Sequence, residues 1–393
     1  MDPRTNPYAP GAGTPPPELA GRSALLEEAA VALDRIRDGR TAKSVLMTGL
    51  RGVGKTVLLN RIARDAENRG FVTVQLEAPE DRPLPDLLAA PLRAALIRMD
   101  RLTAAGAAAK RALQALAGFA RATKVSYQGF EVGVEFGGER GLADSGVLDH
   151  DLGELLCAAG AAALDQRTAL VLFVDELQYV EERQLGALIA ALHQAAQREL
   201  PVTLLGAGLP QLIARTGAAK SYAERLFSFA EIGPLDEDAA STAIQAPAER
   251  LGVTYEPSAL QAIVERTQRY PYFLQEWGKN CWNYAGDPPI TACDVEAATA
   301  QAVAELDAGF FRVRFDRLAP AEKRYLRAMA TLGEGPHRSG AVASVLDKSV
   351  RSVAPIRAKL ISKGTIYSPA HGDTAFTVPL FDGYLKRAMP DDT

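Results

Sequence analysis

The segment GLRGVGKT at residues 49–56 constrains the fold of this chain more than any other stretch of the sequence. An apolar run, SVLMTG (44–49), leads into it, and helical periodicity follows to about Asn68. Glycines let a backbone turn sharply so that several N–H groups point at one phosphate, at the N-terminus of the following helix. The pattern GxxxxGK[ST] and its context therefore predict a buried strand, a phosphate-binding loop and a helix.

The residue types in this loop suit a nucleoside triphosphate with magnesium. Lys55 would place a positive charge on the β- and γ-phosphates, and the Thr56 hydroxyl would be a ligand of Mg²⁺. We therefore expect ATP and Mg²⁺ to bind here. The predicted nucleotide-binding residues of the loop are Gly49, Gly52, Val53, Gly54, Lys55, Thr56 and Val57.

A second strand, VLFVDE (171–176), ends in two acidic residues, as in a Walker B motif. Asp175 is predicted to hold Mg²⁺ through water, and Glu176 to polarise the attacking water as the catalytic base. The presence of both acids favours hydrolysis over binding alone. Gln178 either orients the water or contacts the neighbouring strand.

Two further features bear on how the γ-phosphate is sensed. The stretch LLGAGLP (204–210) offers backbone groups but no Asn, Thr or Ser side chain at the end of its strand. Arg225 is the candidate for a catalytic arginine supplied to a neighbouring subunit, because such arginines stabilise the charge of the transition state. The alternative is a surface arginine paired with Glu224 or Asp236.

The order of elements predicts an α/β P-loop NTPase fold followed by two helical regions. Parallel strands alternate with helices in the first half, helices alone follow, and three helices with a hairpin end the chain, the order of a winged helix. Residues 123–137 alternate in polarity around Gln128-Gly129, which predicts an inserted hairpin. The expected divisions are a Pro/Gly-rich disordered start at 1–18, an ATPase domain at 19–235, a helical lid at 236–310 and a winged-helix domain at 311–393.

Composition limits the remaining possibilities. Three widely spaced cysteines cannot form a disulfide framework, and the sequence has neither a signal peptide nor an apolar run of membrane-spanning length, so we expect a cytoplasmic protein without membrane contact. The whole chain has a net charge of −4, yet residues 312–390 hold 14 Lys and Arg against 6 Asp and Glu. A basic end on an acidic body suggests a partner that carries phosphates.

These motifs, together with LAGR (19–22), ERLFSF (224–229) and YPYFLQEWG (270–278), resemble AAA+ and STAND-type ATPases, with origin-recognition-like ATPases and their actinobacterial relatives the most similar branch. The resemblance implies that Gly21 and Arg22 lie near the adenine base of the bound nucleotide. It also implies a phosphate-sensing arginine where this chain has Tyr272, which favours a slow nucleotide-gated switch over a fast motor.

The predicted winged helix leaves two functions open. In the first, the basic residues on or beside its third helix contact the phosphates of duplex DNA. In the second, the module and the hairpin dock a protein partner, or the chain associates with itself, in a signalling switch. A small-molecule kinase would use the same loop but gives the lid and the C-terminal module no role. The candidate DNA-binding residues are Arg351, Arg357, Lys359 and Lys363.

Overall fold

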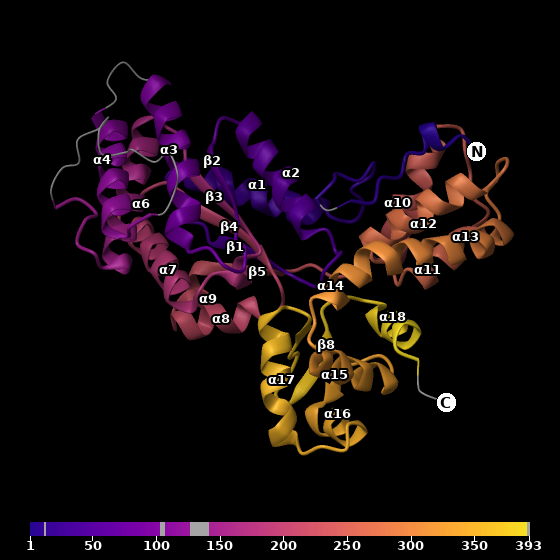
Figure 1. Cartoon of the computed structure of the whole chain (residues 1–393). Coiled ribbons are helices and arrows are strands. Elements are labelled where there is room, and N and C mark those ends of the chain that lie inside the picture. The colour runs from indigo at the N-terminus through magenta and orange to yellow at the C-terminus, as the bar shows by residue number, and fades with distance from the viewer. Residues whose placement is uncertain (12, 103–106, 126–140, 391–393) are drawn as a thin grey trace.

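The computed structural model describes residues 1–11, 13–102, 107–125 and 141–390. Figure 1 shows an α/β domain in indigo to magenta, a group of lid helices in orange, and a C-terminal module in yellow next to both. Most of the predicted hairpin at 123–137 lies outside the described residues. Among the described residues, no helix is both long enough and apolar enough to cross a membrane.

The α/β domain contains five parallel strands in the order β2-β3-β4-β1-β5. The strands are β1 (Ser44–Thr48), β2 (Val72–Glu77), β3 (Leu170–Asp175), β4 (Val202–Gly208) and β5 (Phe227–Glu231). The helices are α1 (Ser23–Arg37), α2 (Lys55–Asn68), α3 (Leu84–Leu102), α4 (Ala107–Ala122), α6 (Leu148–Asp165), the short 3-10 helix η2 (Leu177–Tyr179), α7 (Glu182–Gln197), α8 (Leu212–Ala219) and α9 (Ala223–Leu226).

Helices cover both faces of this sheet, because successive side chains of each strand point to opposite sides. Val45 and Met47 pack with α1 and α2 on one face, whereas Leu46 packs on the other face with α3, α4, α6 and α7. The predicted α/β P-loop NTPase fold is confirmed. The helical structure predicted over 84–121 is found in the described residues as α3 and α4. The sequence prediction also missed β5, a half-buried edge strand too short for a clear alternating pattern.

The lid and the C-terminal module share one hydrophobic core. The lid helices are α10 (Glu237–Glu249), α11 (Pro257–Arg266), α12 (Pro271–Tyr284) and α13 (Ala292–Glu305). The π-helix η3 (Leu306–Phe311) and α14 (Arg312–Asp316) continue α13 without a break. Phe311 stacks on Phe381 of the C-terminal helix at a centroid distance of 5.7 Å. The boundary expected between residues 310 and 311 therefore falls inside a helical run with a shared core.

The C-terminal module contains the predicted three helices and hairpin, with one additional short strand. Its elements are α15 (Pro320–Thr331), β6 (His337–Arg338), α16 (Ser339–Val345), α17 (Val350–Ser362), β7 (Ile366–Tyr367), β8 (Asp373–Phe376) and α18 (Phe381–Ala388). The strands pair antiparallel in the order β6-β8-β7. The strand β6 has only two residues, so no sequence periodicity could reveal it.

The expectation of a disordered start is wrong. The N-terminal segment begins with the 3-10 helix η1 (Pro3–Thr5) and runs along the lid (Figure 1). Tyr8 is buried; its hydroxyl donates to the carbonyl oxygen of Ile244 and lies 3.0 Å from the Tyr255 hydroxyl. Its ring occupies the space beside Gly278, where a Cβ atom would lie 2.8 Å from the ring. Tyr8, together with hydrogen bonds of Asp2 and Asn6 to α12, thus holds in place a segment whose composition alone suggests disorder.

Candidate nucleotide-binding site

The phosphate-binding loop joins the carboxyl end of β1 to the first turn of α2. Gly52 and Gly54 have φ angles of +83° and +91°, in the left-handed region that favours glycine. Gly49 is required for a different reason, because a Cβ atom there would lie 2.1 Å from the Ile232 carbonyl oxygen. The glycine spacing of the motif is therefore explained by backbone conformation at two positions and by packing at the third.

Lys55 points back into the loop. Its Nζ donates to the carbonyl oxygens of Gly49 and Leu50, each at 2.9 Å, and the side chain is 8% exposed. Burial lowers the pKa of Lys55 to about 8, although the nearby carboxylates of Glu176 and Asp175 oppose this shift. The ammonium group thus lies where phosphate oxygens would replace the two carbonyl oxygens as acceptors.

Thr56, in the first turn of α2, and Asp175, at the end of β3, come together although β4 lies between β1 and β3 in the sheet. The Thr56 hydroxyl donates to Asp175 Oδ2 at 2.6 Å, and the other carboxylate oxygen accepts the Glu176 N–H at 2.8 Å. Burial raises the pKa of Asp175. A hydroxyl and a carboxylate are oxygen ligands of the kind that Mg²⁺ takes. Within the described ranges, no three His, Cys, Asp or Glu residues gather to hold a metal, so these ligands fit an ion that is also held by phosphate and water.

The carboxylate of Glu176 is held on two sides. Its Oε1 lies 3.5 Å from Arg51 Nη1, and its Oε2 accepts a hydrogen bond from Gln178 Nε2. The backbone of Glu176 is left-handed, with φ of +51°, a conformation that costs free energy for a residue with a side chain. Gln178 also accepts the N–H of Leu209 at 3.0 Å, so it contacts the end of β4 and fixes Glu176 at the same time.

Arg51 is a site residue that the sequence did not reveal, because it occupies a variable position of the motif. Its Nη2 donates to the Tyr179 hydroxyl at 2.7 Å. Its backbone N–H donates to the carbonyl oxygen of Thr377, just beyond β8, at 2.9 Å. The phosphate-binding loop is therefore in direct contact with the C-terminal module.

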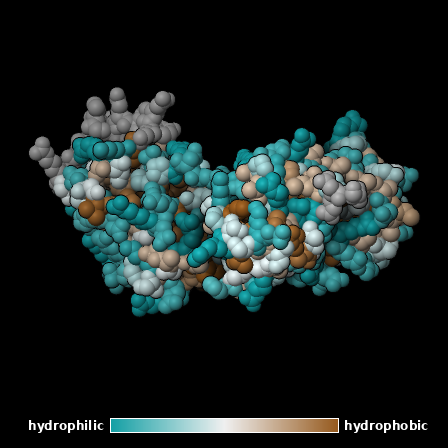
Figure 2. All heavy atoms as spheres, turned by 60° about the horizontal axis from the view of Figure 1, so that its bottom comes forward, coloured by the Kyte–Doolittle hydropathy of each residue, from teal (hydrophilic) through white to brown (hydrophobic). Residues whose placement is uncertain are grey.

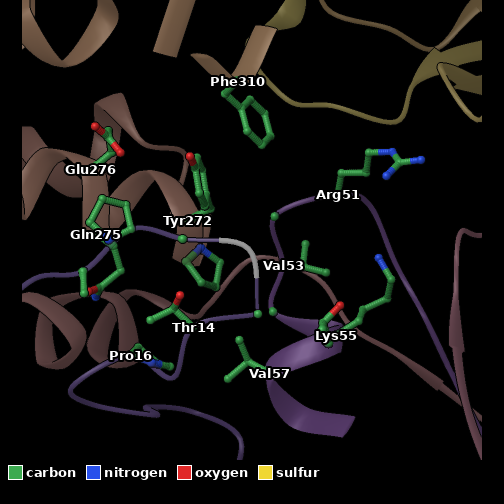
Figure 3. A pocket seen from close by; sticks show the side chains of 18 of the residues that line it. Thr14, Pro16, Arg51, Val53, Lys55, Val57, Tyr272, Gln275, Glu276 and Phe310 are labelled. Atoms are coloured by element: carbon green, nitrogen blue, oxygen red, sulfur yellow. The ribbon is translucent and has the colours of Figure 1, made fainter. Parts of the chain in front are cut away.

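A cavity of about 740 Å³ opens above the loop (Figure 3). Its walls come from the N-terminal segment, the loop, Asp175 and Glu176, the lid helix α12, and the run from η3 to α14. The predicted residues that line it are Arg22, Gly52, Val53, Gly54, Lys55, Thr56 and Val57. Gly21 instead lies against α10, where a Cβ atom would be 2.7 Å from Ala239 Cβ, and Arg22 donates to the Gly233 carbonyl oxygen.

A second arginine that the sequence did not reveal enters the cavity from α14. The Arg314 guanidinium lies 4.0 Å from the centre of the Phe310 ring, and Phe310 stacks on Tyr272 at 4.7 Å. Burial, with a smaller contribution from Arg51, lowers the pKa of Arg314 to about 10. Arg314 forms no ion pair with any carboxylate among the described residues. Tyr272 occupies the position at which the resemblance implies an arginine, and its backbone N–H donates to the Gly52 carbonyl oxygen. The cation in this part of the cavity wall is instead Arg314, which comes from α14.

Arg225 lies far from this cavity within its own chain. It belongs to α9, directly before β5, and its side chain is exposed. Phe227, two residues on, pairs with Ser44 at the start of β1, whereas the phosphate-binding loop follows the end of β1. Arg225 therefore lies at the amino end of the parallel strands, whereas the phosphate-binding loop lies at their carboxyl end. No ion pair with Glu224 or Asp236 occurs among the described residues.

Three of the four candidate DNA-binding residues are engaged inside the C-terminal module. Arg357 donates to Thr374 Oγ1 and Ser368 Oγ at 2.8 Å each and to the Asp373 carbonyl oxygen at 2.7 Å. Lys359 and Lys363 lie 3.7 and 2.7 Å from the buried carboxylate of Glu322. Arg351, at the start of α17, is exposed.

Comparisons with known proteins extend these observations. Residues 18–205 match the AAA ATPase domain family, and residues 308–385 match a domain of unknown function, DUF8462. A search of curated proteins found no match. The Walker-type ATPase PABY2304 of Pyrococcus abyssi is 14% identical, with 94% of this chain and 96% of that chain covered, at a TM-score of 0.59.

Other similar structures give lower scores. Aeropyrum pernix Orc1 in complex with DNA is 16% identical over 94% of this chain and 93% of its own, with a TM-score of 0.45. The RuvB Holliday junction branch migration motor of Thermotoga maritima is 16% identical over 93% and 95%, with a TM-score of 0.43. The family match over residues 18–205, the parallel sheet and the paired Thr56 and Asp175 identify this part of the chain as an AAA ATPase domain with a P-loop.

Proposed function

We propose that this ATPase is a slow, nucleotide-gated switch whose C-terminal module responds to the state of the phosphate-binding loop. The observation that carries the proposal is Arg51. Its guanidinium pairs with the predicted catalytic base Glu176, while its backbone N–H bonds to Thr377 in the C-terminal module. A change in the loop on nucleotide binding therefore acts on the catalytic base Glu176 and on the C-terminal module together.

The residues of the site divide the chemistry of ATP hydrolysis among them. Lys55 exchanges its loop carbonyl partners for the β- and γ-phosphates, and the loop N–H groups bind the same phosphates. Thr56 and Asp175 would hold Mg²⁺, which would supply positive charge where the transition state develops negative charge. Glu176 accepts the proton of the attacking water once it leaves Arg51.

The same geometry favours a low rate. Glu176 is engaged by Arg51 and Gln178, so part of the binding free energy must first release it. The end of β4 provides only backbone groups, because Gly206 and Gly208 lack polar side chains. The lid and the run from η3 to α14 place Lys279 and Arg314 in the cavity wall. Lys279 is paired with Glu276 and Glu305, so we propose that Arg314 contacts the terminal phosphate.

We further propose that residues 311–393 form a winged helix that associates with duplex DNA. The excess of basic residues supports this, as does the exposed Arg351, which follows the exposed Lys348 at the start of α17. The face in Figure 2, with the C-terminal module turned forward, mixes hydrophilic residues with small hydrophobic patches. Such a surface suits electrostatic contact with a phosphate backbone better than burial against a large apolar partner.

Docking of a protein partner is the second candidate. The engagement of Arg357 and Lys363 within the module favours it, because these cations must leave their partners before they can contact DNA phosphates. Binding measured in both nucleotide states would separate the two candidates. A protein partner that the wild type retains in one nucleotide state only, and that Lys55→Ala does not retain in this state-dependent way, would support docking if the wild type binds no DNA in either state.

Hydrogen exchange tests the switch directly. We expect the peptide that spans residues 364–378, and the amide of Arg51, to exchange faster with a non-hydrolysable ATP analogue and Mg²⁺ than in the empty protein. The Lys55→Ala variant should show no such change. Equal exchange in the empty, ADP and ATP-analogue states of the wild type would remove the proposed link between the loop and the module.

A further inference from the structure

Gln275 has a buried carboxamide with an unused acceptor. The residue lies on the second turn of α12 and is 7% exposed. Its Oε1 is buried and accepts no hydrogen bond from any described residue. An amide oxygen removed from water without a donor is destabilising, so such an atom in a cavity wall indicates a missing ligand group.

This carboxamide lines the cavity at the end away from the phosphate-binding lysine. Figure 3 shows Gln275 with Thr14 and Pro16 on the side of Val57, whereas Lys55 and Arg51 lie across the cavity. The position of Gln275 on α12 is fixed, since the neighbouring Tyr272 is hydrogen-bonded to Gly52. A nucleotide with its phosphates at Lys55 would therefore direct its base toward Gln275.

The walls around this end suit a flat aromatic ring. Apolar side chains come from three separate elements, and the N-terminal segment closes one side, held by the buried Tyr8. Stacking surfaces with few polar groups are typical of nucleotide-base sites, in which a small number of placed hydrogen bonds sets specificity. The apolar residues that these elements contribute to the cavity wall are Leu19, Ala20, Val57, Leu235 and Ala243.

We propose that Gln275 selects adenine by accepting a hydrogen bond from the exocyclic amino group at C6 and donating one from Nε2 to a ring nitrogen. A carboxamide and the edge of adenine match as donor to acceptor at both atoms. Hypoxanthine has a carbonyl oxygen at C6 and an N–H at N1, so it would pair only with the carboxamide turned by 180°, with Nε2 in the place of the buried Oε1. This inference rests on the proposed nucleotide-binding function and adds the residue that reads the base.

The test is calorimetric binding of ADP, IDP and purine riboside diphosphate, which lacks only the amino group, to the full chain. The wild type should bind ADP at least about tenfold more tightly than either analogue, the discrimination expected when a buried polar group loses its partner. Gln275→Met, which keeps the side-chain volume, should weaken ADP binding and bring the three affinities within about twofold. Gln261→Met, an exposed glutamine on α11, is the matched control and should leave all three affinities unchanged.

The outcomes are distinct. A wild type that binds ADP and both analogues equally, or a Gln275→Met variant that keeps the preference for ADP, would overturn the role of Gln275 while the nucleotide-binding function stands. A wild type that binds none of the three would contradict the proposed function itself. Melting temperature, measured without nucleotide, shows whether Gln275→Met is folded; if it is not, Gln275→Leu provides the same comparison.

Discussion

The backbone N–H of Arg51 donates a 2.9 Å hydrogen bond to the carbonyl oxygen of Thr377. The two residues lie at opposite ends of the sequence, one in the phosphate-binding loop and the other beyond the last strand. Thr377 is itself fixed, since its hydroxyl donates to the Gly364 carbonyl oxygen at 2.7 Å. The loop therefore cannot shift without straining or breaking a contact with the C-terminal module.

Arg51→Ala should raise the rate of ATP hydrolysis. The substitution frees Glu176 from its ion pair, while the loop N–H groups and Lys55 still bind phosphate. Because both side chains are about one-quarter exposed, the pair is worth ~0.2–1 kcal/mol, so the increase in kcat should not exceed about fivefold. Arg61→Ala, on the exposed face of α2, is the control. A kcat that falls in Arg51→Ala would mean that Arg51 stabilises the transition state instead.

Lys55→Ala and Glu176→Gln should separate binding from hydrolysis. Loss of the Lys55 ammonium should abolish ATP binding, measured with a fluorescent nucleotide. Glu176→Gln should bind ATP normally and hydrolyse it about 10²–10⁴-fold more slowly, because the amide cannot accept the proton of the attacking water. Wild-type turnover by Glu176→Gln would show that another group is the base.

Nucleotide binding should weaken as the pH rises above 8. The pKa of Lys55 is about 8 in the empty protein, and phosphate binding favours the charged lysine and raises that pKa. Below pH 8 the ammonium is already present. Above pH 8 binding must take up a proton, so the affinity should fall by up to tenfold per pH unit.

Calorimetry in buffers of different ionisation enthalpy measures this proton uptake. At pH 8.5 the observed binding enthalpy should depend on the buffer, whereas at pH 6.5 the contribution of Lys55 should vanish. A proton uptake of zero at both pH values would show that Lys55 is fully charged in the empty site.

Arg225→Ala should reduce hydrolysis only where chains meet. Arg225 lies at the edge of the sheet opposite its own loop, so it can act only on a neighbouring subunit. We expect Arg225→Ala to bind ATP normally. The rate of ATP hydrolysis per chain should rise with protein concentration in the wild type but not in Arg225→Ala. Equal rates for both proteins at every concentration would remove Arg225 from the catalytic residues.

Arg351→Ala and Arg357→Ala should have opposite effects on DNA binding and stability. Arg351 is exposed, so its loss should weaken binding to duplex DNA and lower the salt dependence by about one phosphate contact, with little change in Tm. Arg357 ties α17 to the β7–β8 hairpin, so its loss should lower Tm by several degrees. Unchanged DNA binding in Arg351→Ala would favour the protein-docking candidate.

The sequence by itself determined the parts of this protein that are local. Glycine conformation and the strand before it specify the phosphate-binding loop, and the acids at the end of β3 follow directly from the apolar run before them. The helices of the lid were equally predictable from their periodicity. These features depend on residues within about one turn or one strand of each other.

Contacts between distant segments were decided only by the tertiary structure. Arg51 occupies a variable motif position, Arg314 lies in an ordinary helix, and Gln275 looks like any helical glutamine, yet folding brings all three to one cavity. Conversely, Arg357 and Lys363 resemble exposed cations in the sequence but are engaged within the module. Charge and residue type are local properties, whereas a partner hundreds of residues away is chosen by packing, which no sequence period encodes.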